Sequence, residues 1–148
     1  MMMPVEKVMS DHIPTVNETA TVAEAITVMK AAHSAIALVT HRTTSTTYGL
    51  VTAADIVSRI AAYGRDPKEF SVVEAMSPTS LAVSPELGVE YAARLMANSQ
   101  IQQALVLRLG TPGIVTALDI FYRSDFDTRP KGPLDTSILA DFKLSRWH

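Results

Sequence analysis

The residues best suited to chemistry lie in a block that occurs twice. Residues 49–56 read Gly-Leu-Val-Thr-Ala-Ala-Asp-Ile, and residues 113–120 read Gly-Ile-Val-Thr-Ala-Leu-Asp-Ile. Each block follows an apolar stretch typical of a strand and precedes a stretch with helical periodicity. A Thr and an Asp three residues apart at the start of a helix therefore need an explanation, and two are available.

The first explanation is structural. The hydroxyls of Thr52 and Thr116 can accept the amide of the residue three positions later, and Asp55 and Asp119 can reach back as in a capping box.

The second explanation is ligand binding at the same helix starts. A helix N-terminus attracts phosphate, a Thr hydroxyl can bond a phosphate oxygen, and a carboxylate can accept both hydroxyls of a ribose. Arg59 and Arg123, four residues after each Asp, either meet a phosphate or lie on a solvated helix face.

Composition excludes several other kinds of chemistry. The chain has no cysteine, which excludes disulfides, thiolate zinc sites and cysteine nucleophiles. A net charge of -2 and 6% aromatic residues argue against nucleic-acid binding. The four histidines lack metal-ligand spacing, and no phosphate-binding glycine loop or nucleophile elbow occurs. We therefore expect no metal and no enzyme activity.

The same survey predicts a soluble, cytoplasmic protein. No apolar run approaches the ~20 residues of a membrane span, and the N-terminus lacks the apolar core of a signal peptide.

The elements that must position the paired Thr and Asp are repeated as well. An offset of 67 residues aligns Val8-Met9-Ser10 with Ala75-Met76-Ser77 and Ala37-Leu38-Val39 with Ala104-Leu105-Val106. The offset then becomes 64 for the block at 49–56 and 113–120. Self-similarity of this length indicates two copies of one structural unit.

Each copy predicts strand, helix, strand, strand, helix. Strands are expected at 13–16, 35–40 and 48–52, and again at 80–83, 103–107 and 113–116. The first helices carry apolar faces at Val22, Ala25, Ile26 and Met29, and at Val89, Ala92, Ala93 and Met96. Thr21 with Glu24 suits a capping box, and Pro85 with Glu86 suits a first helical turn. The second helices start near Ala53 and Ala117, and Gly64 is expected to end the former.

The fold class is therefore α/β, with two tandem β-α-β-β-α repeats packed through their sheets. We assign residues 5–63 to the first repeat, 64–71 to a linker, 72–123 to the second repeat and 124–148 to a C-terminal tail. The tail is expected to dock on the domain or to serve as an arm that binds a partner.

This ordered combination resembles a tandem pair of CBS (cystathionine-beta-synthase) domains, or Bateman module. The resemblance covers about residues 5–123, and it implies a pseudo-two-fold axis between the repeats. It also implies a regulatory module that binds an adenosyl compound (AMP, ADP, ATP or S-adenosylmethionine) as an effector in clefts between the repeats. No cofactor is required.

The resemblance also implies which residues line the two clefts. One cleft would combine Thr116, Asp119 and Ile114 with Ile13, Pro14 and Thr15. The other would combine Thr52, Asp55 and Leu50 with Ser80, Leu81 and Ala82. In each, the Asp holds the ribose while Ile114 or Leu50 packs on the base.

One departure from the family limits the charge of the ligand. Many members carry a basic residue before the middle strand, whereas this chain has Ala35-Ile36-Ala37 and Ile101-Gln102-Gln103-Ala104 there. This difference disfavours a triphosphate. Gln102 or Gln103 either bonds a base or sugar, or lies exposed at a strand edge.

The resemblance further implies a homodimer formed through helices, for which the apolar faces at 56–60 and 89–96 are candidates. The repeats and the linker leave no room for the effector domain that such a module usually controls. The output is therefore expected to pass to a separate, unknown effector protein, or to lie in the tail at 124–148. The alternative function is a ligand-free dimerising scaffold, in which the Thr and Asp pairs are only caps.

Overall fold

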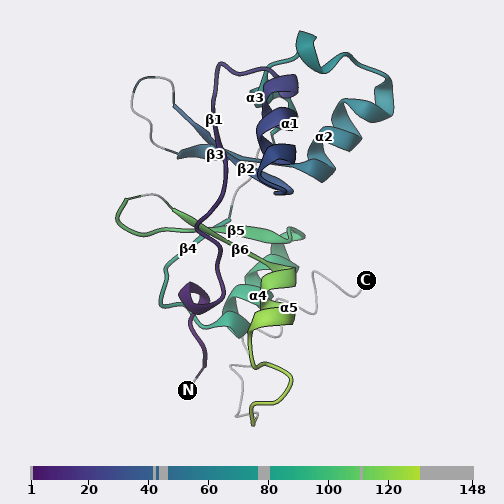
Figure 1. Cartoon of the computed structure of the whole chain (residues 1–148). Helices are drawn as coiled ribbons and strands as arrows, with labels where there is room; N and C mark the ends of the chain where they lie inside the picture. Colours follow the sequence, from purple (N-terminus) through teal and green to yellow (C-terminus); the bar gives the residue numbers. More distant parts are fainter. Residues whose placement is uncertain (1, 42, 44–46, 77–80, 111, 131–148) are drawn as a thin grey trace. The chain divides into compact units, whose positions relative to one another are not determined.

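The computed structural model describes residues 2–41, 43, 47–76, 81–110 and 112–130. The chain forms two compact units (Figure 1). We call His12–Ser80 the contiguous unit, and Met1–Asp11 with Leu81–His148 the composite unit. Most of the predicted tail, residues 131–148, lies outside the described residues.

The contiguous unit has a three-stranded mixed sheet in the order β1-β2-β3. Strand β1 (Thr15–Asn17) is parallel to β2 (Ile36–Thr40), which is antiparallel to β3 (Thr47–Thr52). Helices α1 (Val22–Ala31), α2 (Ala53–Arg59) and α3 (Val72–Ala75) accompany it, with short 3-10 turns at Ala61–Tyr63 and Pro67–Glu69.

The composite unit repeats this arrangement with strands β4 (Leu81–Val83), β5 (Gln103–Val106) and β6 (Gly113–Thr116). Its strand pairing is again parallel then antiparallel. Helices α4 (Val89–Ser99) and α5 (Ala117–Arg123) pack with it, together with the 3-10 turn Val5–Lys7. The predicted α/β class with two β-α-β-β-α repeats is confirmed.

Each unit has its own apolar core between helices and sheet. Val39 and Val51 of the contiguous sheet pack with Val22, Ala25 and Met29 of α1. The same positions of the composite unit are Val106, Val115, Val89, Ala92 and Met96. The predicted helical faces are therefore the ones that pack on the sheets. Burial of such side chains contributes about 1.5–3 kcal/mol each for the larger ones.

The segment at the head of each repeat packs into the core of the other repeat. Val5 and Val8 belong to the composite core, and Val72, Ala75 and Met76 belong to the contiguous core. Backbone hydrogen bonds hold both segments in place: the Val5 amide donates to the Leu87 carbonyl, and the Val72 amide to the Ala20 carbonyl. Figure 1 shows the N-terminal segment beside β4 and α4. The segments correspond at the repeat offset of 67, so the exchange is reciprocal.

This exchange explains a difference from the sequence prediction. Helix α4 starts at Val89, with Gly88 as its N-cap, and not at Pro85 and Glu86. The Pro85 carbonyl accepts the Glu6 amide, and the Val89 amide donates to the Met3 carbonyl. The groups that a longer helix needs are therefore occupied by the N-terminal segment.

The other helix ends follow the prediction more closely. The Thr21 hydroxyl caps α1 by accepting the Glu24 amide at 3.1 Å. Gly64, at φ +63°, closes the 3-10 turn that follows α2. Helices α1 and α4 are followed by His33 (φ 52°) and Gln100 (φ 59°), which are non-glycine residues in the left-handed region. These two positions also correspond at offset 67, so the repeat symmetry extends to backbone conformation.

Candidate functional site

The paired Thr residues are helix caps in both units. The Thr52 hydroxyl accepts the Asp55 amide at 3.0 Å, and the Thr116 hydroxyl accepts the Asp119 amide at 3.1 Å. Both Thr residues have the extended backbone that an N-cap adopts. The structural explanation of these hydroxyls is confirmed. Each hydroxyl still carries a proton that it can donate to another group.

The two Asp residues differ in what their carboxylates bind. The Thr116 amide donates to Asp119 Oδ2 at 3.0 Å, which completes a capping box. Within the described residues, no such bond reaches the Asp55 carboxylate. Both side chains are partly exposed. Asp55 therefore offers two carboxylate oxygens to a ligand, and Asp119 offers one outside its cap.

Most first-turn amides of the short helices α2 and α5 already have acceptors. The Ala53 amide donates to the Ala35 carbonyl at 2.8 Å, and the Ala117 amide to the Gln102 carbonyl at 2.9 Å. The third amide of each helix is bonded by the capping Thr. Of the first three amides of each helix, one therefore has no acceptor within the described residues and can bind an anion. The helix starts are therefore weak phosphate sites.

The predicted base-packing residues lie on strands that lead into these helices. Leu50 and Ile114 are buried, and they pair in register with Leu38 and Leu105. Because side chains alternate along a strand and Val51 and Val115 belong to the helix-side cores, Leu50 and Ile114 lie on the opposite sheet face. Each is two residues from the capping Thr.

The extended segments predicted to contact the ligand flank the edge strands. The Pro14 carbonyl accepts the Leu38 amide at 2.9 Å. Ile13 and Leu81 are half-buried. Thr15 and Ala82 are exposed. Ser80 lies outside the described residues. Each predicted cleft combines residues of both units, so the clefts stay predictions. Within the contiguous unit lie Ile13, Pro14, Thr15, Leu50, Thr52, Asp55 and Arg59, and within the composite unit lie Leu81, Ala82, Ile114, Thr116, Asp119 and Arg123.

The two arginines bind backbone carbonyls. Arg123 Nη1 donates to the Val8 carbonyl at 3.2 Å and to the Met9 carbonyl at 3.4 Å. Arg59 Nη1 donates to the Met76 carbonyl, and Met76 corresponds to Met9 at offset 67. Each arginine thus anchors the exchanged head segment to the helix that follows the capping Thr, which is α2 or α5. The sequence signal for this role is the equal spacing of both arginines from their Asp. The predicted contacts of these arginines were with phosphate or solvent.

The anchored segment extends the composite sheet next to Ile114. The Ser10 amide donates to the Ile114 carbonyl, and the Ile114 amide to the Ser10 carbonyl, both at 2.8 Å. Arg123 therefore supports the backbone beside the predicted base-packing residue, a positioning role that sequence reasoning missed.

No group of three or more His, Asp or Glu residues able to hold a metal occurs among the described residues. Gln102 is exposed and Gln103 is half-buried. No helix in the described ranges combines the length and apolar character needed to cross a bilayer.

Comparison with known proteins identifies the family. Residues 5–62 match the CBS domain family. The hexameric CBS-CP12 protein from bloom-forming cyanobacteria is 40% identical over 89% of this chain and 74% of that chain, with a TM-score of 0.82. Comparison with curated protein sequences gives no match.

Two more distant structures share the fold. A conserved CBS domain protein of Thermoplasma acidophilum is 24% identical over 98% of this chain and 76% of its own, with a TM-score of 0.74. A CBS domain protein of Pyrobaculum aerophilum, solved in complex with AMP, is 16% identical over 96% and 99%, with a TM-score of 0.71. With two β-α-β-β-α units, paired Thr-x-x-Asp helix starts and these relatives, the chain belongs to the CBS domain family as a tandem CBS pair.

Proposed function

We propose that this CBS pair is a regulatory module that binds an adenosyl compound, such as AMP, ADP, ATP or S-adenosylmethionine. The observation that carries the proposal is a partly exposed carboxylate at each helix start, five residues after a buried apolar residue on the sheet face away from the helices. A carboxylate beside an apolar surface suits a ribose joined to a flat base. The AMP complex of the P. aerophilum relative supports this ligand class.

We assign the roles of the site residues as the family resemblance implies. In the contiguous unit, Asp55 accepts the two ribose hydroxyls, Leu50 packs on the base, and the Thr52 proton bonds a ribose or phosphate oxygen. Ile114, Thr116 and Asp119 take these roles in the composite unit, where Asp119 has one oxygen already bonded to its cap. The Asp55 site is therefore the stronger of the two. The remaining cleft residues follow the family resemblance.

The charge available at these sites favours a ligand with few phosphates. Two of the first three amides of α2 and α5 have acceptors, and Arg59 and Arg123 are engaged by carbonyls. A triphosphate binds best where several cations converge. We therefore expect AMP or S-adenosylmethionine to bind more tightly than ATP.

Regulation follows if the ligand binds two arrangements of the protein with different affinity, because only differential affinity shifts an equilibrium. We propose that the chain is a homodimer that passes this change to a separate effector protein. The hexameric state of the CBS-CP12 relative is consistent with association through a CBS pair. The module acts by binding and not by catalysis.

Titration calorimetry tests this function. The wild type is titrated with AMP, ADP, ATP and S-adenosylmethionine, and compared with Asp55→Ala and Asp119→Ala. Asp127→Ala is the matched control, since Asp127 is an exposed carboxylate outside both predicted sites. We expect at least one of the site variants to lose affinity and the control to keep it. Equal binding by the wild type and both site variants excludes the assigned carboxylates.

A ligand-free dimerising scaffold is the second candidate function. The complete capping box of Thr116 and Asp119 favours it, because that pair is already satisfied without a ligand. A thermal-shift panel separates the candidates, since a ligand at 100 times its dissociation constant stabilises the fold by about 2.7 kcal/mol. No shift with any adenosyl compound supports the scaffold.

A further inference from the structure

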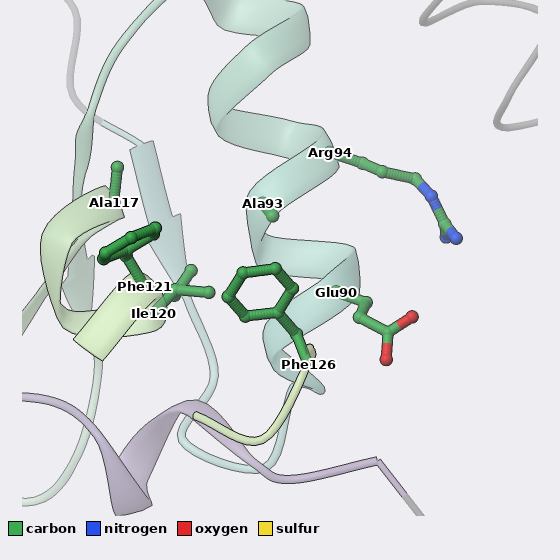
Figure 2. Close-up of a pocket in the computed structure, with 7 residues that line it drawn as sticks. All are labelled: Glu90, Ala93, Arg94, Ala117, Ile120, Phe121 and Phe126. Carbon is green, nitrogen blue, oxygen red and sulfur yellow. The ribbon is translucent and has the colours of Figure 1, made fainter. Parts of the chain in front are cut away.

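The two units differ in what fills the groove between their helices. In the composite unit, Phe126 follows α5 and packs against the composite core. Figure 2 shows its ring between α4 and α5, near Ala93, Ile120 and Phe121. The volume that remains in this α4–α5 groove is about 390 Å³. The composite unit thus shows that an aromatic side chain fits between the two helices of a repeat.

The segment that carries this ring has a distinct charge pattern. Asp125 and Asp127 stand on either side of Phe126 in the sequence. Arg129 of the same segment forms an ion pair with Glu90 of α4. The occupant of the α4–α5 groove is therefore an aromatic residue between two acids, and a neighbouring cation ties it to the helix.

The α1–α2 groove of the contiguous unit lacks this occupant among the described residues. At the offset of 64, Ala62 stands where the composite unit has Phe126. At the offset of 67, Ala23 stands where it has Glu90. The ring and its ionic anchor are therefore missing together. The α1–α2 groove has a volume of about 710 Å³, which is larger than that of the α4–α5 groove.

The α1–α2 groove has apolar walls and a basic end. Four apolar side chains of the two helices line the walls: Ile26, Met29, Ile56 and Val57. Lys30 and His33, at the C-terminal end of α1, line the groove as well. Both side chains are exposed, and neither has an ion-pair partner within the described ranges. This groove therefore places basic groups beside an apolar surface, whereas the α4–α5 groove places Glu90 there.

We propose that the α1–α2 groove is the docking site for a segment of the effector protein, and that this segment carries an aromatic residue flanked by acidic residues. The inference rests on the separate effector of the proposed function and names the surface that it contacts. The ring enters the groove as Phe126 enters the corresponding groove of the composite unit. The acidic residues lie beside Lys30 and His33.

The lining of the groove decides both parts of this chemistry. Aromatic side chains bury a large apolar area with few rotatable bonds, and they dominate the energetics of interfaces. Basic groups at the edge of a contact select an acidic partner and fix its orientation more than they add affinity. The ring is therefore expected to supply most of the binding free energy, and the acids most of the specificity.

The chain's own acidic and aromatic segment is engaged elsewhere. Phe126 packs against the composite core, and Arg129 pairs with Glu90. Docking of this segment into the α1–α2 groove of a second copy would break both contacts. The occupant is therefore expected to come from a different protein.

A blocked pentapeptide with the sequence of residues 124–128, Ser-Asp-Phe-Asp-Thr, is a probe with the required chemistry. It lacks Arg129, so it cannot form the ion pair with Glu90 that favours the α4–α5 groove. The peptide is titrated to millimolar concentration into the isotope-labelled full chain, and binding is followed by the NMR shifts of backbone amides. One control peptide has Ala in place of Phe, and another has Asn in place of both Asp residues.

Two variants of the protein, each with a matched control, test the groove. Val57→Arg places a long charged side chain on the apolar wall, and Ser58→Arg places it at the next exposed position of α2. Lys30→Glu reverses the charge of the basic end, and Lys68→Glu makes the same change at an exposed position outside the groove lining. Far-UV circular dichroism checks that each variant is folded.

We expect the peptide to shift amides along the α1–α2 groove. Val57→Arg in the protein, or Ala for Phe in the peptide, should weaken binding at least about tenfold. Lys30→Glu and the Asn peptide should weaken it several-fold, while Ser58→Arg and Lys68→Glu leave it unchanged. The absence of shifts, equal binding by Val57→Arg, or shifts confined to the α4–α5 groove overturns the proposal.

A second copy of the chain is the competing occupant, because the sequence also made residues 56–60 a candidate dimer face. Light scattering separates the two occupants. If Val57→Arg turns a wild-type dimer into a monomer and the peptide shifts no amide of the groove, a second copy fills the groove and the proposal is overturned. AMP titration of the same proteins measures adenosyl binding, so failure of the proposed ligand and failure of the docking site are recognised separately.

Discussion

Removing the two corresponding carboxylates is expected to have unequal effects on stability. Asp119 accepts the Thr116 amide at 3.0 Å, while Asp55 has no reciprocal cap bond among the described residues. Asp119→Ala and Asp55→Ala both remove a negative charge from a first helical turn, a loss of about 0.3–1 kcal/mol. Only Asp119→Ala also removes a capping bond, which adds about 1 kcal/mol.

Urea unfolding followed by far-UV circular dichroism measures this difference. With a slope of about 2 kcal/mol per M, an extra loss of about 1 kcal/mol places the midpoint of Asp119→Ala about 0.5 M below that of Asp55→Ala. Thr52→Ala and Thr116→Ala are the controls, since both caps accept an amide at similar distances. These two controls are expected to lower stability by similar amounts. The reasoning fails if Asp55→Ala is as destabilising as Asp119→Ala.

A double-mutant cycle sharpens the same test. Thr116 and Asp119 form one reciprocal box, so the loss in the double variant should be smaller than the sum of the single losses. Additive losses mean that the two bonds of the box form independently of each other.

The remaining predictions concern the backbone. Gln100→Gly is expected to raise the free energy of unfolding by about 0.5–1 kcal/mol, because glycine adopts the left-handed region at φ 59° without steric strain; an unchanged or lower midpoint in urea contradicts this. Arg123→Ala is expected to speed hydrogen exchange of the Ser10 amide about tenfold, since a bond from a charged donor contributes about 1.5–3 kcal/mol. Unchanged protection of the Ser10 amide shows that the Arg123 anchor is not needed to hold the head segment. Gly113→Ala is expected to destabilise the fold by about 1–3 kcal/mol, because a Cβ at this position lies 2.6 Å from Met9 Sδ. Adding Met9→Ala should restore part of the lost stability. The absence of any rescue contradicts the assigned clash.

Local sequence patterns predicted the fold well where the interactions are local. The starts of α2 and α5 at Ala53 and Ala117 could be predicted because a Thr and an Asp three residues apart satisfy the first amides within one turn. The strands at 103–107 and 113–116 were located to within one residue, because their apolar runs end at turn residues.

Predictions failed where the partner is distant in sequence. The start of α4 was misplaced because the carbonyl of Pro85 is bonded by the Glu6 amide. The arginines were connected with ligand or solvent, whereas Arg59 binds a carbonyl 17 residues away and Arg123 one 115 residues away. A hydrogen bond to a main-chain carbonyl requires no particular side chain on the acceptor, so the sequence carries little trace of it.

The exchange of head segments has a consequence for the order of folding during synthesis on the ribosome. All members of the contiguous core, Val16 to Met76, are synthesised before β5 and β6. Val5 and Val8, by contrast, are synthesised before the contiguous core but find their partners only when Val106, Val115 and Ile120 follow. These two apolar side chains therefore wait for about a hundred residues of further translation. The head segment that carries them precedes the contiguous unit in synthesis and follows it in folding, because it completes the composite core.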